Sequence, residues 1–335
     1  MNWTQALCIA FAAISFSCQS TALTSAKLYL QKDKPEEAKA QLVEVLSQEP
    51  ENAEAHFLMG KIYAAEGAYE KMAEAFGFAA EYSDAFTEDI EQIRTFYWVR
   101  EYNIGVSHVQ AETPDLDKAL EGFANATSVD SARLDGWKNL AYIYYQLERP
   151  EDAIKAYEHI RENWPEDPNS LYSLGVLYLN KESYEAAVSA LSTLTAIDPK
   201  HFSGHVNLAI AQANLEDFSA AEGSYKKAIA IDPQAADAPY NLGNLYWQQQ
   251  DYAAALQAYN KAMELAPDDD DTLYNLAITY IALEDLDAAL PLLEQLSKRR
   301  PDKASVWSEL GRIYAIKGQT AKSREAYERE EMLSP

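Results

Sequence analysis

Asparagine recurs along this sequence at intervals close to 34 residues, in a row that Ser173 and Glu309 interrupt. Five of them, in chain order, are Asn103, Asn139, Asn207, Asn241 and Asn275. An asparagine amide has one acceptor and two donors, so a regular row could bond the backbone amides of an extended peptide without reading its sequence. The alternative, which the sequence leaves open, is that asparagine fills these positions because it bonds neighbouring backbone.

Residues that could ligate a metal or carry a reaction do not form a set. His201 and His205 have ligand-like spacing, but His205 takes a packing position of the repeat described below and His201 lies in the preceding turn. The run Asp268–Asp271 stands at a predicted helix start, where carboxylates favour the positive end of the dipole. Because no glycine-rich phosphate loop, metal motif or Ser-His-acid set is found, we expect no catalytic residue, no metal, no cofactor and no enzymatic activity.

A fixed period positions these residues. Prolines recur every thirty-four residues over the second half of the chain, at Pro165, Pro199, Pro233, Pro267, Pro301 and Pro335. A constant period without insertions is typical of a chain that stacks one small unit rather than folding around one core. Length alone would predict two or three domains, and the repeat overrides that expectation.

Residues 236–269 represent the repeating unit. Apolar residues with helical spacing form two sets, namely Leu242, Leu245 and Tyr246, then Tyr252, Leu256, Tyr259 and Met263. A polar turn separates the sets, and Pro267 ends the second one. The unit is therefore two antiparallel helices, and neither helix could bury its apolar face without the neighbouring unit.

Some positions keep their residue type from one unit to the next. Position eight is small and position twenty is usually alanine, as in Gly243 and Ala255, which predicts helices that cross with little room between their backbones. Positions eleven and twenty-four are mostly large, as in Tyr246 and Tyr259, and would fill the space that the small residues leave. Together with the unit length and the terminal proline, this pattern resembles the tetratricopeptide repeat.

The resemblance covers nearly everything after residue 18. It implies an all-α fold, a right-handed α-solenoid of about nine tetratricopeptide helix-turn-helix repeats. We expect repeats one and two at 19–86 and repeats three to nine at 98–335. Residues 87–97 break the period with helical spacing and no Gly or Pro, so we interpret them as a helical insertion that lengthens the first helix of repeat three. Its role as a bend, a dimer contact, a partner site or a harmless insertion stays open.

Residues 1–18 are expected to be a signal peptide. The apolar run Ala6–Phe16 is too short to span a membrane, and no repeat begins upstream of about residue 19. Cys18 follows in a stretch that resembles a bacterial lipoprotein processing site, although Ser15 and Phe16 depart from that pattern. Two interpretations follow. In one, Cys18 is lipidated and anchors the protein to a membrane; in the other, ordinary cleavage occurs after Ala22 or Ala26. Both predict an exported protein, periplasmic or anchored in the cell envelope, rather than a cytoplasmic one.

The net charge of −25 limits the classes of partner. A surface this acidic repels nucleic acid phosphates and anionic lipid headgroups, so we expect neither as a partner. It suits a protein partner with a basic or extended segment instead.

Binding is expected on the first helices of the repeats, which line the inner face of such a solenoid. Their inward positions are aromatic and apolar, and exposed surfaces of that kind tend to bind partners. We expect Tyr142, Tyr145 and Trp247 to be partly open there, beside Asn244 and the asparagine row. That row resembles the asparagine ladder in the repeat domain of O-linked N-acetylglucosamine transferases. The alternative is that these residues pack against the next repeat.

The resemblance implies a non-enzymatic scaffold that binds a partner's peptide or helix in its concave groove, in the bacterial cell envelope. Two alternatives remain open. The chain could target or present substrate to a separate enzyme such as a glycosyltransferase, or it could be a structural array that self-associates. The sequence predicts neither the identity of the partner nor the oligomeric state.

Overall fold

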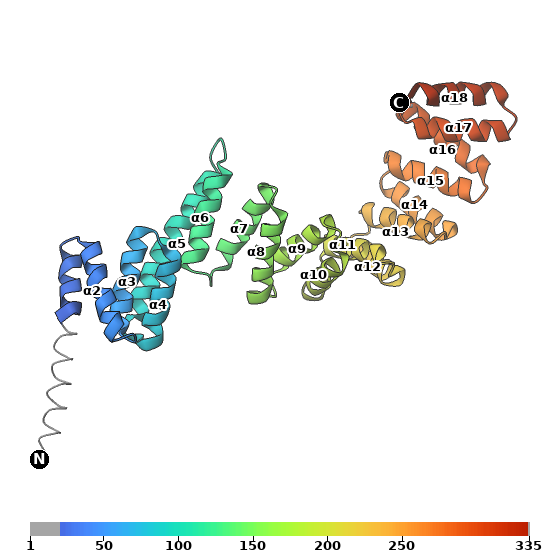
Figure 1. Cartoon of the computed structure of the whole chain (residues 1–335). Helices are drawn as coiled ribbons and strands as arrows, with labels where there is room; N and C mark the ends of the chain where they lie inside the picture. Colours follow the sequence, from blue (N-terminus) through green and yellow to red (C-terminus); the bar gives the residue numbers. More distant parts are fainter. Residues whose placement is uncertain (1–20, 334–335) are drawn as a thin grey trace, which may run out of the picture. The chain divides into compact units, whose positions relative to one another are not determined.

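The computed structural model describes residues 21–333, and within them every regular element is a helix and no strand occurs. The chain divides into two compact units, with the boundary between Pro165 and Glu166. Within each unit, consecutive helices pack as pairs, and each pair packs on the next (Figure 1). The predicted all-α fold of stacked tetratricopeptide helix pairs is therefore confirmed.

The first unit begins with helical residues 21–31. The elements that follow are α2 (Pro35–Gln48), α3 (Ala53–Glu66), α4 (Tyr69–Tyr82), the short 3₁₀ helix η1 (Asp84–Phe86), α5 (Thr87–Val109), α6 (Leu116–Val129), α7 (Leu134–Gln146) and α8 (Pro150–Asn163). Pro35 and Pro150 each occupy the first turn of a helix, where the missing amide N–H costs nothing.

The second unit is regular throughout. Its elements are α9 (Pro168–Asn180), α10 (Tyr184–Ile197), α11 (Phe202–Asn214), α12 (Phe218–Ile231), α13 (Asp237–Gln248), α14 (Tyr252–Leu265), α15 (Asp270–Ala282), α16 (Leu286–Arg299), α17 (Ala304–Ile316) and α18 (Thr320–Leu333). Odd-numbered helices are the first helices of their repeats and even-numbered helices are the second.

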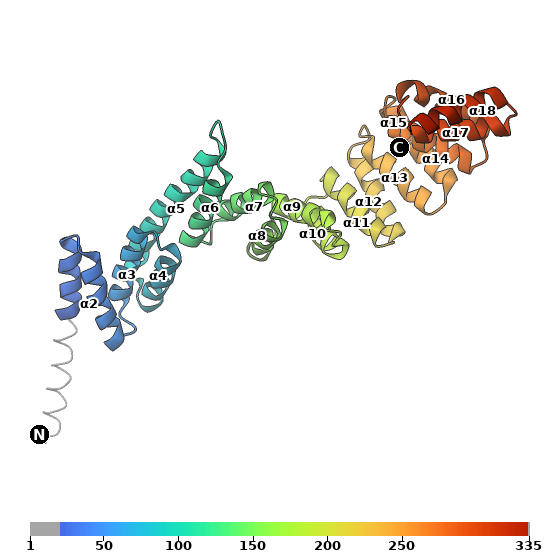
Figure 2. The same cartoon turned by 45° about the horizontal axis from the view of Figure 1, so that its top comes forward.

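Helix α5 differs from the other helices in length. It contains 23 residues, whereas each of the other α-helices from α2 to α18 contains 12 to 14. Residues 87–97 form its first half and continue into the second half without a break. Figure 2 shows α5 beside α6, the second helix of the same repeat.

The turn inside each regular repeat uses one left-handed residue. This residue is position fifteen, counted from the first residue of the repeat, and its φ lies between 55° and 73°. It is glycine at Gly67 and Gly318, and elsewhere it is Asp33, Glu148, Glu182, Glu216, Gln250 or Glu284. The next N–H donates to a carbonyl five residues back, as from Arg149 to Tyr144, which closes the end of the helix.

The two helices of a repeat cross at position eight, as the sequence predicts. A Cβ added to Gly243 would lie 2.6 Å from the ring of Tyr259, the residue at position twenty-four. In repeat three the neighbouring atom is backbone rather than side chain, because a Cβ on Gly122 would lie 2.6 Å from the backbone N of Gly105. The alanines of position twenty, such as Ala255, are fully buried at the same crossings.

The predicted signal peptide of residues 1–18 and the candidate lipidation residue Cys18 lie outside the described residues. Among residues 21–333, no helix is both long and apolar enough to cross a membrane.

Candidate partner-binding surface

Three asparagines of the predicted row bond tyrosines of the preceding repeat. The side-chain amide of Asn139 donates to the hydroxyl of Tyr102 at 3.0 Å in the first unit. In the second unit, Asn207 donates to Tyr172 at 3.4 Å and Asn275 donates to Tyr240 at 3.3 Å. Each bond joins position five of one repeat to position six of the next. We call these three contacts the Tyr–Asn pairs.

The other predicted asparagines have different surroundings. Asn103 is exposed and Asn241 is half-buried, and neither side chain forms a hydrogen bond within residues 21–333. The Asn244 side-chain oxygen accepts from the Tyr259 hydroxyl at 2.7 Å and from the Asn275 amide at 3.2 Å. The row is therefore not uniform, because several of its amides are already bonded to neighbouring side chains.

The predicted aromatic residues differ in exposure. Tyr142 is 47% and Tyr145 is 50% exposed, and both project from α7 in the first unit. Trp247 in the second unit is half-buried, with its ring centroid 4.8 Å from that of Tyr252.

Helix α5 carries an open face that the sequence interpretation did not include. Asp89, Gln92, Phe96, Val99 and Asn103 are spaced three or four residues apart, so they share one side of the helix. All five are exposed, and Phe96 at 63% is among the most exposed large apolar residues of the first unit. The same spacing was visible in the sequence and could have identified this face.

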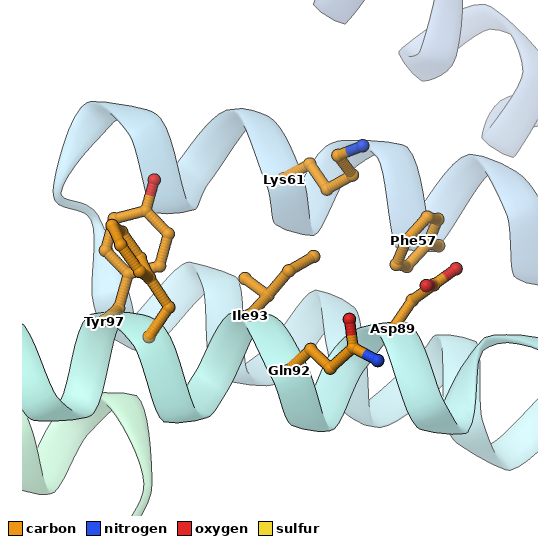
Figure 3. Close-up of a pocket in the computed structure, with 7 residues that line it drawn as sticks. Phe57, Lys61, Asp89, Gln92, Ile93 and Tyr97 are labelled. Atoms are coloured by element: carbon orange, nitrogen blue, oxygen red, sulfur yellow. The ribbon is translucent and has the colours of Figure 1, made fainter.

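A groove of about 380 Å³ lies between α3 and the first half of α5. It is lined by Phe57 and Lys61 from α3 and by Asp89, Gln92, Ile93, Phe96 and Tyr97 from α5. Figure 3 shows Asp89 and Ile93 of α5 pointing toward the side of α3 that carries Phe57 and Lys61. We call this the α3–α5 groove.

The floor of the groove belongs to the core of the first unit. Phe57 is nearly buried and stacks on Phe86, with ring centroids 4.7 Å apart. Ile93 and Tyr97 pack against the same core cluster. The walls of the groove are therefore fixed by packing rather than by exposed contacts alone.

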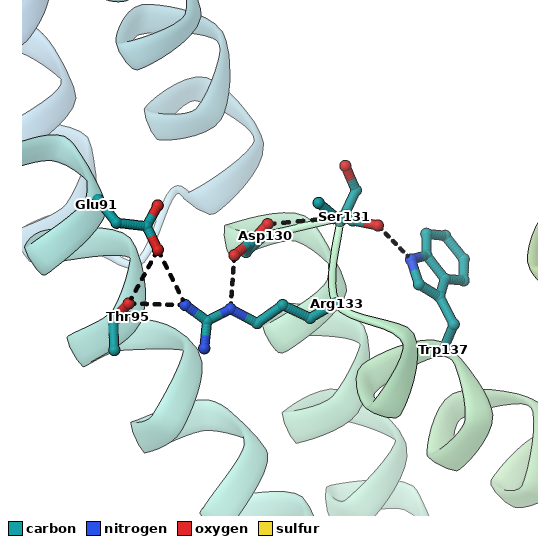
Figure 4. A network of polar contacts seen from close by, with 7 residues as sticks. Glu91, Thr95, Asp130, Ser131, Arg133 and Trp137 are labelled. Atoms are coloured by element: carbon teal, nitrogen blue, oxygen red, sulfur yellow. Dashed lines mark hydrogen bonds and ion pairs between the residues drawn. The ribbon is translucent and has the colours of Figure 1, made fainter. Parts of the chain in front are cut away.

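Polar contacts attach the first half of α5 to the α6–α7 turn (Figure 4). The Arg133 guanidinium donates to the Thr95 hydroxyl at 2.7 Å and lies 3.3 Å from the Glu91 carboxylate. The same group donates to Asp130 at 2.7 Å, within its own turn. One arginine thus links the insertion to the following repeat.

A buried carboxylate holds the second half of α5. Glu101, only 5% exposed, accepts from the Tyr69 hydroxyl at 2.8 Å, from Arg100 at 2.9 Å and from Asn125 at 3.1 Å. Burial, and then the hydrogen bond to Glu101, raises the pKa of Tyr69 to about 12. These contacts join α4, α5 and α6 through one side chain.

Ring N–H groups recur at position four of several repeats and donate to the turn before the repeat. The acceptors are the carbonyls of Pro50 for His56, Ser131 for Trp137, Pro199 for His205 and Pro301 for Trp307, at 2.7 to 3.1 Å. His201 accepts from the Gly204 amide as a helix cap. Both histidines with ligand-like spacing therefore have roles within the fold, and no group of three potential ligands for a metal lies within residues 21–333.

The acidic run Asp268–Asp271 is bonded within the second unit. Asp269 caps α15 by accepting from the Thr272 amide at 2.8 Å. Arg299 lies 3.3 Å from Asp268, and Lys303 lies 3.4 Å from Asp271. These ion pairs join the start of α15 and the turn before it to the end of α16 and the turn that follows it.

The geometry described above is that of tetratricopeptide repeats, and the chain belongs to that family. One family model, described as a tetratricopeptide repeat, matches residues 23–85, 138–201 and 206–270, which together exceed half of the chain. Two further models of the same description match residues 246–313 and 304–329. Members of this family are typically non-catalytic interaction scaffolds, and the chain has the general character of a protein-interaction scaffold.

Two solved structures with TM-scores of 0.50 or more show the same fold. A tetratricopeptide repeat protein from Parabacteroides merdae is 16% identical and has a TM-score of 0.54, over 72% of this chain and 94% of that one. PilF from Pseudomonas aeruginosa is 17% identical and has a TM-score of 0.50, over 67% of this chain and 99% of that one. MamA from Desulfovibrio magneticus is 21% identical, over 50% of this chain and 94% of that one, with a TM-score of 0.47. No curated protein matches the sequence.

Proposed function

We propose that this chain is a non-enzymatic scaffold that holds a short extended or helical segment of a partner protein against the first helices of its first unit. The observation that carries the proposal is the exposure of large apolar side chains on α5 and α7, namely Phe96, Val99, Tyr142 and Tyr145. Burial of such side chains against a partner lowers the free energy, because apolar surface is removed from water. Exposed apolar surface on a protein is typical of interaction sites.

The asparagine row has a smaller part in this proposal than the sequence alone suggested. Asn103 keeps its amide available on the open face of α5, whereas Asn139 already donates to Tyr102 and to the backbone carbonyl of Asp135. Apolar side chains would therefore supply affinity, and Asn103 would supply a hydrogen bond to the partner backbone.

We also propose that the protein acts in the bacterial cell envelope after export. Ala22 and Ala26 lie in the core cluster of the first unit. Cleavage after Ala26 would remove both residues from that core, so processing at Cys18 suits the fold better. In source cells, a Cys18→Ser variant is expected to be absent from the membrane fraction. An immunoblot of cell fractions tests this.

The binding proposal is tested by affinity capture from an envelope extract, with bound proteins identified by mass spectrometry. The test variant is Tyr142→Ser with Tyr145→Ser, and the matched control is Val43→Ser on the second helix α2, where the side chain is 54% exposed. We expect a partner that the native chain and the control retain and the double variant loses. A partner that the double variant retains and the control loses would move the site to the second helices.

A further inference from the structure

The α3–α5 groove exists because the period breaks at α5. In a regular repeat, a first helix begins near position one. The first half of α5 instead extends by residues 87–97, and its first-helix face has no counterpart in the other repeats. Ile90 and Ile93 pack into the core and fix this segment, and Phe96 stays exposed at the rim of the groove.

We propose that the α3–α5 groove is the docking site for the partner and accepts one class of segment in one direction. The segment would seat an apolar side chain between Phe57 and Phe96, with a basic residue facing Asp89 and a carboxylate facing Lys61. This inference rests on the proposed function and names the partner's chemistry at that surface.

The apolar part of the recognition follows from how the walls are built. Phe57, Ile93 and Tyr97 are fixed by the core, so the groove is formed before a partner arrives. Pre-formed sites lose less conformational entropy on binding than sites that must be ordered. Phe96 lies on the rim, and an entering side chain would bury it.

The charged part follows from two side chains without ion-pair partners. Some charges nearby are paired, as in Lys27–Glu54 at 2.7 Å and Lys39–Glu66 at 3.0 Å, whereas others, such as Lys71 and Glu88, have no ion pair within residues 21–333. Lys61 and Asp89 have no ion pair within residues 21–333, and they lie on opposite walls of the groove (Figure 3).

Opposite unpaired charges on opposite walls favour one orientation of a bound segment and disfavour the reverse. The net charge of −25 adds a general attraction for the basic end of the segment, which speeds encounter.

Arg133 would not contact the bound segment; it holds α5 in place beside the groove. Its bonds to Glu91 and Thr95 hold the half of α5 that carries Asp89, Ile93 and Phe96. Arg133 pairs with Glu91, whereas Asp89, the acid that lines the groove, has no ion pair within residues 21–333.

The experiment pans a phage-displayed library of random short peptides on the intact chain and measures the affinity of enriched peptides. We expect peptides with an apolar anchor, a basic residue on one side of it and an acidic residue on the other. Phe96→Ser should weaken them about tenfold or more. The charge swap Lys61→Glu with Asp89→Lys should enrich peptides with the reverse order of charges.

Two controls separate this inference from the proposed function. Val43→Ser should bind the peptides as the native chain does, and circular dichroism should show native helix content for every variant, since the changed side chains are exposed. Peptides that tolerate Phe96→Ser but lose affinity with Tyr142→Ser and Tyr145→Ser would overturn the groove and keep the scaffold. If neither Phe96→Ser nor the Tyr142→Ser, Tyr145→Ser double variant changed the affinities, or if no peptide were enriched, the groove and the scaffold would both be overturned. An unchanged order of charges in the enriched peptides after the swap would overturn the fixed direction.

Discussion

The two units place apolar side chains of their first helices in different environments. In the second unit, positions five, nine and twelve of α9, α11, α13 and α15 are all buried or half-buried. In the first unit, Tyr142 and Tyr145 occupy positions nine and twelve of α7 and are about half exposed, and Phe96 on α5 is exposed further. From α9 to α15 the stacked repeats cover these positions, whereas α5 and α7 leave large apolar side chains in contact with solvent.

The largest effect that separates the units is expected where helices cross. In Gly122→Ala, the new Cβ would meet backbone atoms, the N of Gly105 at 2.6 Å and the O of Glu101 at 2.9 Å. Because backbone cannot rotate away, we expect a loss of about 3 kcal/mol of stability. In Gly243→Ala the Cβ meets the ring of Tyr259, which can shift, so the expected loss is about 1 kcal/mol.

Urea unfolding followed by circular dichroism measures both changes. The control is Gly223→Ala, at a helical glycine with no atom within 4 Å of the added Cβ, and it should stabilise by about 0.5 kcal/mol or more. Equal tolerance of Gly122→Ala and Gly223→Ala would contradict the close backbone crossing in repeat three.

A second difference lies in the carboxylates that accept from tyrosines. Glu101→Ala should cost about 2 kcal/mol, because three donors from α4, α5 and α6 lose a buried acceptor. Glu294→Ala in the second unit removes a more exposed acceptor of the Tyr314 hydroxyl and should cost less than about 1 kcal/mol. The same unfolding measurement compares them, and equal losses would show that burial of Glu101 does not matter.

A third, smaller effect tests the asparagine row inside the regular unit. Asn275→Ala removes donors to Tyr240 and Asn244 and should cost about 1 kcal/mol. Asn241→Ala removes no hydrogen bond within the described residues and should change stability by less than about 0.5 kcal/mol. A thermal melt of both variants decides whether the Tyr–Asn pairs stabilise the array, since similar shifts would argue against it.

The smallest effect is a pH dependence in the second unit. Burial lowers the pKa of His205 below its ordinary value of 6.5. As pH falls, His205 therefore takes up a proton in the unfolded chain before it does so in the folded chain. Stability should consequently fall as pH drops below about 6.5 toward the folded pKa. His205→Trp, which keeps a ring N–H as Trp137 and Trp307 do, should remove this part of the dependence. Urea midpoints across that pH range test it, and an unchanged slope in the variant would exclude His205 as the source.

The sequence predicted those contacts that depend on fixed positions of the 34-residue repeat. The pairing of Gly243 with Tyr259 followed from residue size at two fixed positions, and the structure places them in contact. It did not predict that Asn139, Asn207 and Asn275 bond tyrosines, because each partner lies more than thirty residues earlier and belongs to another repeat.

The open face of α5 was missed for a different reason. Whether Phe96 is covered depends on which helices stand beside it, and residues 87–97 have no equivalent in the other repeats from which to infer their neighbours. The left-handed turns at Glu182 and Glu216 were missed as well, because neither residue is typical of that conformation.

The Tyr–Asn pairs imply a particular response of the array to mechanical load. They join repeats three to four, five to six and seven to eight, whereas Val206 replaces the tyrosine between six and seven, and Glu309 replaces the asparagine between eight and nine. Under tension, the junctions without a pair are expected to separate first. Repeats five and six, and repeats seven and eight, would then each unfold as one step that releases about 230 Å of extended chain, and repeat nine would unfold alone.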